Sequence, residues 1–158
     1  MTAEQKKEFT RRVSQANSAQ LIVILYEIAL VYVKDAISFM EKEDMDNARI
    51  QADYAKKCLE EMIQNLHFEY DLAKTLHQIY LSMKKSLREG IRDKEKEQLI
   101  SVKNNLQKLR DAYAQIASQD DSAPVMSHTQ TVVAGLTYGR HSLNENLSDV
   151  SSDRGFRV

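Results

Sequence analysis

A nearly unbroken run of apolar residues is the most distinctive feature of the pattern along this chain. Between positions 21 and 33 (LIVILYEIALVYV) every side chain except Glu27 is apolar. A helix that faces a core with one side needs an apolar stripe of only about 100°, so a helix that is apolar all round must be covered on every side. Spanning a membrane takes about 20 such residues, and Lys34 and Asp35 end the run earlier. The run therefore predicts a helix at the centre of a bundle, or one whose surplus face binds a partner.

This helix has a clear start in the sequence. Asn17 can accept a hydrogen bond from an early backbone N–H, and Gln20, three positions later, can bond back to the cap residue as in a capping box. We expect the helix to run to about Glu43. Before it, residues 4–14 are expected to add a turn or two of helix.

Three further helices are predicted from apolar residues that recur at alternating intervals of three and four, which places them on one helical face. The second helix is expected after an acidic turn, with Asp44 or Asp46 as its cap. The third is expected to begin near Asp71 and to stop at Gly90, a favourable residue just past a helix end. The fourth is expected to be capped by Asp93. The predicted core positions are Ala48, Ala52, Ala55, Leu59, Met62 and Leu66, then Leu72, Leu76, Ile79, Met83 and Leu87, and finally Leu99, Val102, Leu106, Leu109, Tyr113 and Ile116.

Together these segments predict an all-α protein, an antiparallel four-helix bundle with a short N-terminal segment. Residues 1–117 hold a single glycine and no proline, whereas the remaining 41 residues hold the other three glycines, the only proline and no lysine. We therefore expect a helical domain at 1–117 and a flexible or loosely docked tail at 118–158. A short helix near 136–150 would form only on a surface, since it is marginal alone.

Composition narrows the class of partner. The formal net charge is −1, from 22 basic and 23 acidic residues, which gives no electrostatic case for nucleic acid or an anionic membrane. The single cysteine excludes an internal disulfide and fits a reducing compartment. The first residues lack the apolar stretch of a secretory signal. We therefore expect a cytoplasmic protein without membrane insertion.

Residue patterns for catalysis are mostly absent. No His/Cys cluster has zinc spacing, no glycine-rich loop joins a strand to a helix, and no Glu stands three residues before a histidine, as a di-metal bundle site requires. We expect no metal, no cofactor and no enzyme activity. Cys58 has no base or second thiol near it in sequence and is expected to be inert.

His77 keeps one alternative open, because phosphorelay domains are also helical bundles with one exposed histidine. The Lys-Gly pair that usually follows the phosphorylated histidine is missing here. A structural histidine is therefore the simpler interpretation.

The surplus apolar surface of the first long helix is the main clue to function. Apolar patches above a few hundred Å² are rare on monomers, and covering one can supply several kcal/mol at about 25 cal/mol per Å². The N-terminal segment, the tail or a peptide partner could cover it. The positions expected to face the other helices are Leu21, Ile24, Leu25, Ile28, Tyr32 and Ala36, and those expected to spill round the helix are Ile22, Val23, Tyr26, Leu30 and Val33.

Four segments, in order, resemble the family of flagellin-specific export chaperones called FliS. VSQANSAQLIVILYE resembles the family's opening signature, with Asn17, Leu25, Tyr26 and Glu27 among the matching positions. EDMDNARIQADYAKKCLEEMIQNL resembles the second long helix, LAKTLHQIYLSMKKSLREG the next, and LRDAYAQI the terminal Leu-Arg-Asp-Ala-Trp motif, with Tyr113 in place of the tryptophan. Each segment alone is weak, but four in order are specific.

The resemblance implies a cytoplasmic chaperone that needs no cofactor. It would bind the disordered C-terminal segment of flagellin in an apolar groove, prevent premature polymerisation, and aid delivery to components of the flagellar type III export apparatus. A monomer or weak homodimer is expected. The candidate contact residues are Phe9 and Val13, as an inward-facing movable lid, with Leu21, Ile22, Val23, Leu25, Tyr26 and Leu30. The alternative is a helical adaptor or regulatory protein of flagellar assembly whose groove is covered by its own tail.

Overall fold

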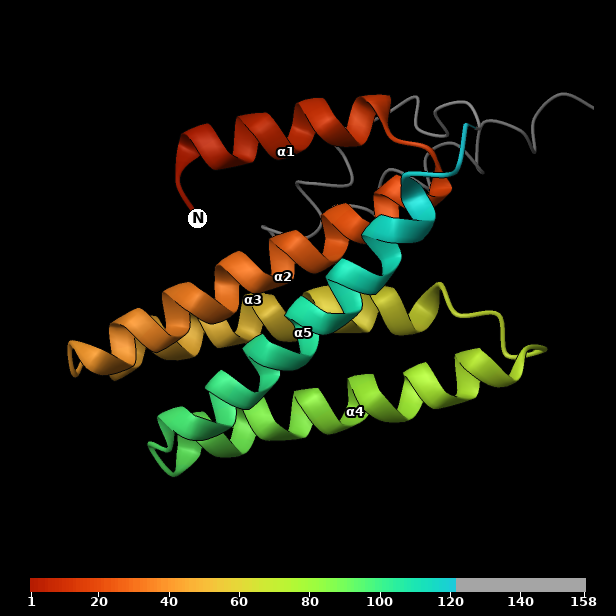
Figure 1. Ribbon diagram of the computed structural model, residues 1–158. Helices are drawn as coiled ribbons and strands as arrows, with labels where there is room; N and C mark the ends of the chain where they lie inside the picture. Colours follow the sequence, from red (N-terminus) through yellow and green to blue (C-terminus); the bar gives the residue numbers. More distant parts are fainter. Residues whose placement is uncertain (122–158) are drawn as a thin grey trace, which may run out of the picture.

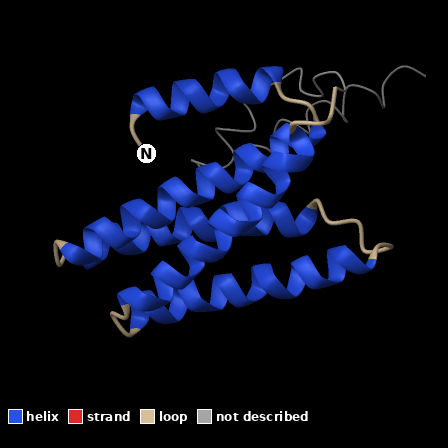
Figure 2. Cartoon of the chain, in the orientation of Figure 1, coloured by secondary structure: helices blue, strands red, loops and turns tan. Residues whose placement is uncertain are grey.

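Five helices make up the described part of the computed structural model, which covers residues 1–121 (Figures 1 and 2). They are α1 (Ala3–Gln15), α2 (Ser18–Glu41), α3 (Met45–Gln64), α4 (Asp71–Arg92) and α5 (Lys96–Ala117). These residues contain no strand, so the all-α class is confirmed. The expected number of helices was wrong, because the N-terminal segment forms a complete helix of 13 residues. The short helix expected near 136–150 lies outside the described residues.

Local capping explains where the first helices begin. The side chain of Asn17 accepts a hydrogen bond from the backbone N–H of Gln20 at 2.9 Å, and Gln20 Oε1 accepts one from the Asn17 backbone at 3.0 Å. This confirms the predicted capping box. Thr2 and Gln5 form a second capping box at the start of α1. Asn17 also donates from Nδ2 to the backbone carbonyl of Asp120 at 2.9 Å, so the cap of α2 holds the chain just beyond α5.

The later boundaries partly contradict the predictions. Asp44 caps α3 through the backbone N–H of Asn47 at 3.2 Å, which decides between the two aspartates considered. Asp93 does not cap α5; it is the C-cap residue of α4 and pairs with Arg92. The chain turns there through Lys94, whose φ of 58° lies in the left-handed region. An extra turn residue therefore displaces the start of α5 from the expected position.

Helices α2 to α5 form a ring in which each packs on two others (Figure 1). Helix α2 contacts α3 and α5, and α4 closes the ring between those two, while α1 packs on α2 alone among the described helices. Most of the predicted core positions of α3, α4 and α5 are buried or packed against the core. Leu72 and Ile116 are exceptions, at 62% and 58% exposed. Both lie in terminal turns, where the helix extends past the neighbours that would cover it.

Gly90 lies inside the last turns of α4, not after its end as predicted. Its role is close packing between α4 and α5: a Cβ there would overlap Cδ1 of buried Leu99 and lie 3.1 Å from the carbonyl oxygen of Glu95. We expect Gly90→Ala to lower the free energy of unfolding by about 1–3 kcal/mol through overpacking, although alanine has the higher helix propensity by about 1 kcal/mol. Urea denaturation checks this, and an unchanged or raised midpoint would contradict it.

Candidate functional site

Helix α1 lies along α2 and is held there by apolar side chains. Phe9 and Val13 are four positions apart and therefore share a face of the helix. Both are buried, Val13 to 1% exposure, in the same core as Ile24 and Tyr26 of α2. Their predicted inward orientation is confirmed. At the other end of α1 the N-terminal ammonium of Met1 pairs with Asp35 of α2.

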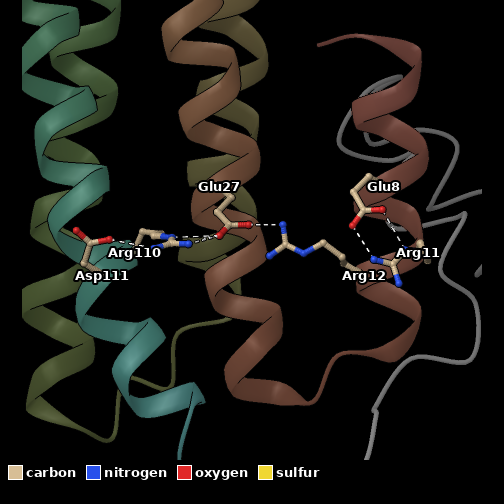
Figure 3. A network of polar contacts seen from close by, with 6 residues as sticks. All are labelled: Glu8, Arg11, Arg12, Glu27, Arg110 and Asp111. Atoms are coloured by element: carbon tan, nitrogen blue, oxygen red, sulfur yellow. Dashed lines mark hydrogen bonds and ion pairs between the residues drawn. The ribbon is translucent and has the colours of Figure 1, made fainter.

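Glu27, the only charged residue in the apolar run, joins three helices (Figure 3). Its side chain is 16% exposed. Arg110 of α5 donates from Nε and Nη2 to Glu27 Oε1 at 3.0 and 2.8 Å. Arg12 of α1 places Nη1 2.5 Å from Glu27 Oε2. A carboxylate this buried is stable only when cations compensate it, and here α1 and α5 each supply one.

The two arginines do not hold Glu27 equally. Arg110 makes two hydrogen bonds to one oxygen, and bonding to Glu27, then to Asp111, raises the pKa of its guanidinium. Within residues 1–121, the other oxygen, Oε2, has the Arg12 ion pair but accepts no hydrogen bond of good geometry. Charge-assisted hydrogen bonds are the stronger kind of ion pair. The α5 side of the network is therefore fixed more firmly than the α1 side.

An open pocket of ≈ 440 Å³ lies beside this network, between α1, α2 and α5. Its walls combine small and apolar residues with the charged group. They are Arg12, Gln15 and Ala16 near the end of α1, Gln20, Val23, Ile24 and Glu27 of α2, and Arg110, Ala114, Ala117 and Ser118 from α5 and its end. The pocket marks where the space between α1 and the ring is incompletely filled.

The predicted contact residues of α2 divide into four groups. Val23 is buried and lines the pocket, Tyr26 and Leu30 are buried in the interior, and Leu21 and Leu25 are half-buried. Ile22 is 37% exposed. The expected assignment of inward and outward faces was therefore partly wrong. Val23, Tyr26, Leu30 and Val33 were expected to spill outward but are buried, and Leu21 and Leu25 were expected to face inward but are only half-buried. Helix α1 packs on α2 in addition to α3 and α5. A wider and differently oriented part of the α2 surface is therefore buried than packing on the ring alone would bury.

Tyr26 belongs to a buried aromatic cluster rather than to a surface. Its ring lies 6.4 Å from that of Tyr80 and 5.6 Å from that of Tyr113, centroid to centroid. The hydroxyls of Tyr26 and Tyr80 hydrogen-bond to each other. Burial is the main cause that raises the pKa of both phenols, so both stay neutral. The cluster joins α2, α4 and α5.

Two other side chains considered from the sequence lie apart from this site. Cys58 is buried in the core, and burial raises the pKa of its thiol to about 12. Because the thiolate is the reactive form, the native thiol is inert. His77 is half-buried and packs edge-on against Phe68, with ring centroids 5.2 Å apart. Within residues 1–121, no group of three or more His, Cys, Asp or Glu side chains is arranged to hold a metal ion.

Sequence reasoning missed the charged half of the site. Arg12 and Arg110 were not among the predicted contacts, and Glu27 was noted as an interruption of the apolar run and as a match to the family's opening signature, without a partner. A lone carboxylate in such a run was the available signal, since a buried charge needs a partner. The partners could not be identified because Arg110 is 83 positions away in sequence.

The fold is that of an all-helical protein, in which a separate N-terminal helix covers part of α2, one of the four helices of the ring. The family model described as Flagellar protein FliS matches residues 1–120, and the chain belongs to this family. The family is one of flagellar chaperones and not of enzymes, so the resemblance seen in the sequence is confirmed. A comparison with curated proteins gave no match. None of the helices in residues 1–121 has the length and apolar character needed to cross a membrane.

Proposed function

We propose that this protein is a cytoplasmic export chaperone that binds the disordered C-terminal segment of flagellin. Binding would keep flagellin from polymerising prematurely and present it to the flagellar type III export apparatus. The site would be the surface of α2 that α1 covers, together with the pocket against α5. Family membership supports the chaperone role, and the geometry of α1 supports this location.

The observation that carries the proposal is that α1 is attached to the ring through α2 alone among the described helices. Its middle is held by two buried side chains and by the Arg12–Glu27 ion pair, and its start by the ion pair between the Met1 ammonium and Asp35. A helix shorter than about 12–15 residues is marginal alone, so an undocked α1 has little structure of its own. An amphipathic segment with similarly spaced apolar residues can take its place, which is helix-in-groove recognition.

The residues that α1 covers would then be the contact surface. Val23 lines the pocket directly, and Ile22 beside it is already partly exposed. Phe9 and Val13 would act as the lid and leave when flagellin binds. The division into a helical domain at 1–117 and a tail at 118–158 belongs to the same proposal, with the tail dispensable for this contact.

Calorimetric titration with a peptide of the C-terminal ~40 residues of the flagellin from the same genome tests the proposal. We expect saturable one-to-one binding with a negative heat-capacity change, the signature of buried apolar surface. The control is a chain that ends at Gln119, which is expected to bind equally well. If neither chain binds, the proposed function is wrong. If only the shorter chain binds, the tail covers the groove and the adaptor alternative gains support.

A further inference from the structure

A second cleft, rich in basic side chains, lies between α3 and α4. Its volume is ≈ 340 Å³, and a hollow of ≈ 410 Å³ continues it along the same two helices, sharing Asp53, Lys56 and Arg88. We call the two together the basic cleft. Its cations are Arg49, Lys56 and Lys57 of α3 and Lys84, Arg88 and Arg92 of α4.

The basic cleft is much more positively charged than the chain as a whole. Six basic side chains line it against two acidic ones, Asp53 and Glu60, whereas the chain as a whole has a net charge of −1. The cations recur at helical spacing on both helices, Arg49 and Lys56 on one and Lys84 and Arg88 on the other. They therefore form two facing rows.

Internal ion pairs leave part of this charge uncompensated. Asp53 pairs with Lys56 at 2.6 Å, Glu60 with Lys84 at 2.9 Å, and Asp93, just outside the cleft, with Arg92 at 2.7 Å. Arg49 and Arg88 are exposed and make no ion pair with any residue in the described range 1–121. One arginine from each helix is thus available to an anionic group.

The walls between these rows are apolar. Ala52 of α3 and Leu87 and Ile91 of α4 line the cleft beneath the charged side chains. All three are almost fully buried, at 2%, 0% and 7% exposure, so they form a narrow apolar floor, and anionic groups at the edges of a ligand would make most of its contacts. An amphipathic helix with carboxylates beside its apolar stripe has this arrangement.

We infer that the basic cleft is a docking surface for an acidic amphipathic helix of a partner protein. Charge complementarity favours a protein over a nucleic acid, because the cleft contains two carboxylates and no aromatic side chain on which a base could stack. A nucleic-acid backbone carries a phosphate at every nucleotide and would bring negative charge close to both Asp53 and Glu60. A helix can instead place its own carboxylates at positions between these two side chains.

The position of the cleft makes this contact independent of the proposed flagellin site. Helices α3 and α4 form one side of the ring, and α1 packs on α2 but on neither of them (Figure 1). The two surfaces do not share a lining residue. A partner can therefore dock on the basic cleft whether or not α1 is displaced.

Fluorescence anisotropy of the full chain tests the inference with a synthetic helical peptide. The peptide has leucines at i, i+4 and i+7 and glutamates on both sides of that stripe. We expect saturable binding that Arg49→Glu with Arg88→Glu weakens about tenfold or more, and that salt weakens progressively. A peptide with lysines for the glutamates is expected to prefer the double variant.

The matched control reverses the same amount of charge elsewhere, with Lys103→Glu and Lys108→Glu on α5, and is expected to bind as the unchanged chain does. Circular dichroism verifies that both variants keep their helices. Equal binding by the unchanged chain and the cleft variant, or equal loss in both variants, would overturn the inference. Tighter binding of single-stranded RNA or of phosphatidylserine vesicles than of the peptide would overturn the assignment to an acidic protein helix.

Discussion

Replacing Val13 by Asp is expected to tighten the binding of the flagellin C-terminal segment about tenfold or more. Val13 is 1% exposed beneath α1, and burying an unpaired carboxylate there costs more than the docked helix gains. The apparent affinity of a covered site falls with the fraction of molecules in which it is open, so undocking α1 raises that affinity. Calorimetric titration of both proteins with the same peptide measures the change.

The matched control for this variant is Ser14→Asp, which adds the same charge at an exposed neighbouring position of α1 and is expected to leave the affinity unchanged. Amide hydrogen exchange provides a second readout, because α1 should lose protection in the Val13 variant while α2 to α5 keep theirs. A weaker complex would show that α1 belongs to the binding surface instead of covering it. Lost protection throughout the ring would mean that the variant had unfolded.

Substitution of Arg110 by Gln is expected to lower the free energy of unfolding by about 1–3 kcal/mol, and Arg12→Gln by less than about 1 kcal/mol. Arg110 makes two hydrogen bonds to Glu27, and its loss leaves a carboxylate that is only 16% exposed without its main partner. Arg12 makes a single ion pair to the other oxygen. Urea denaturation at constant m-value measures both changes.

Arg11→Gln is the matched control for these two variants. Arg11 is a neighbouring arginine that pairs with Glu8 on the exposed surface of α1 and reaches neither α2 nor α5 (Figure 3). Its removal should leave the midpoint unchanged, as is usual for an exposed pair. If Arg12→Gln destabilised the chain as much as Arg110→Gln, the two sides of the Glu27 network would be equally firm, and α1 would be an integral part of the core.

Much of the secondary structure could be predicted because its causes are local. The capping box of Asn17 and Gln20 depends on groups three residues apart, and the seam of α3 depends on intervals of three and four. The failures arise where contacts between helices override a local signal. Gly90 was interpreted as a helix end, since glycine is common there, but its cause is the approach of Leu99 from another helix.

The candidate site could be predicted only in its apolar half. The sequence indicated that α2 has more apolar surface than one stripe requires, and that Phe9 and Val13 share a face. It did not indicate which part of α2 each neighbour covers, and so Tyr26 was expected at the surface instead of in the aromatic cluster with Tyr80 and Tyr113. That arrangement depends on three helices at once.

By itself, then, the sequence determined the four long helices, the cap of the first of them, most of the core positions, and the family, because hydrogen bonds within a turn and the helical period are properties of neighbouring residues. The tertiary structure alone decided that α1 covers α2, that Glu27 lies between Arg12 and Arg110, and that the cations of α3 and α4 face one another across a cleft. Each of these depends on the packing of helices distant in sequence. Packing is set by the total burial that all the helices achieve together, which no local pattern specifies.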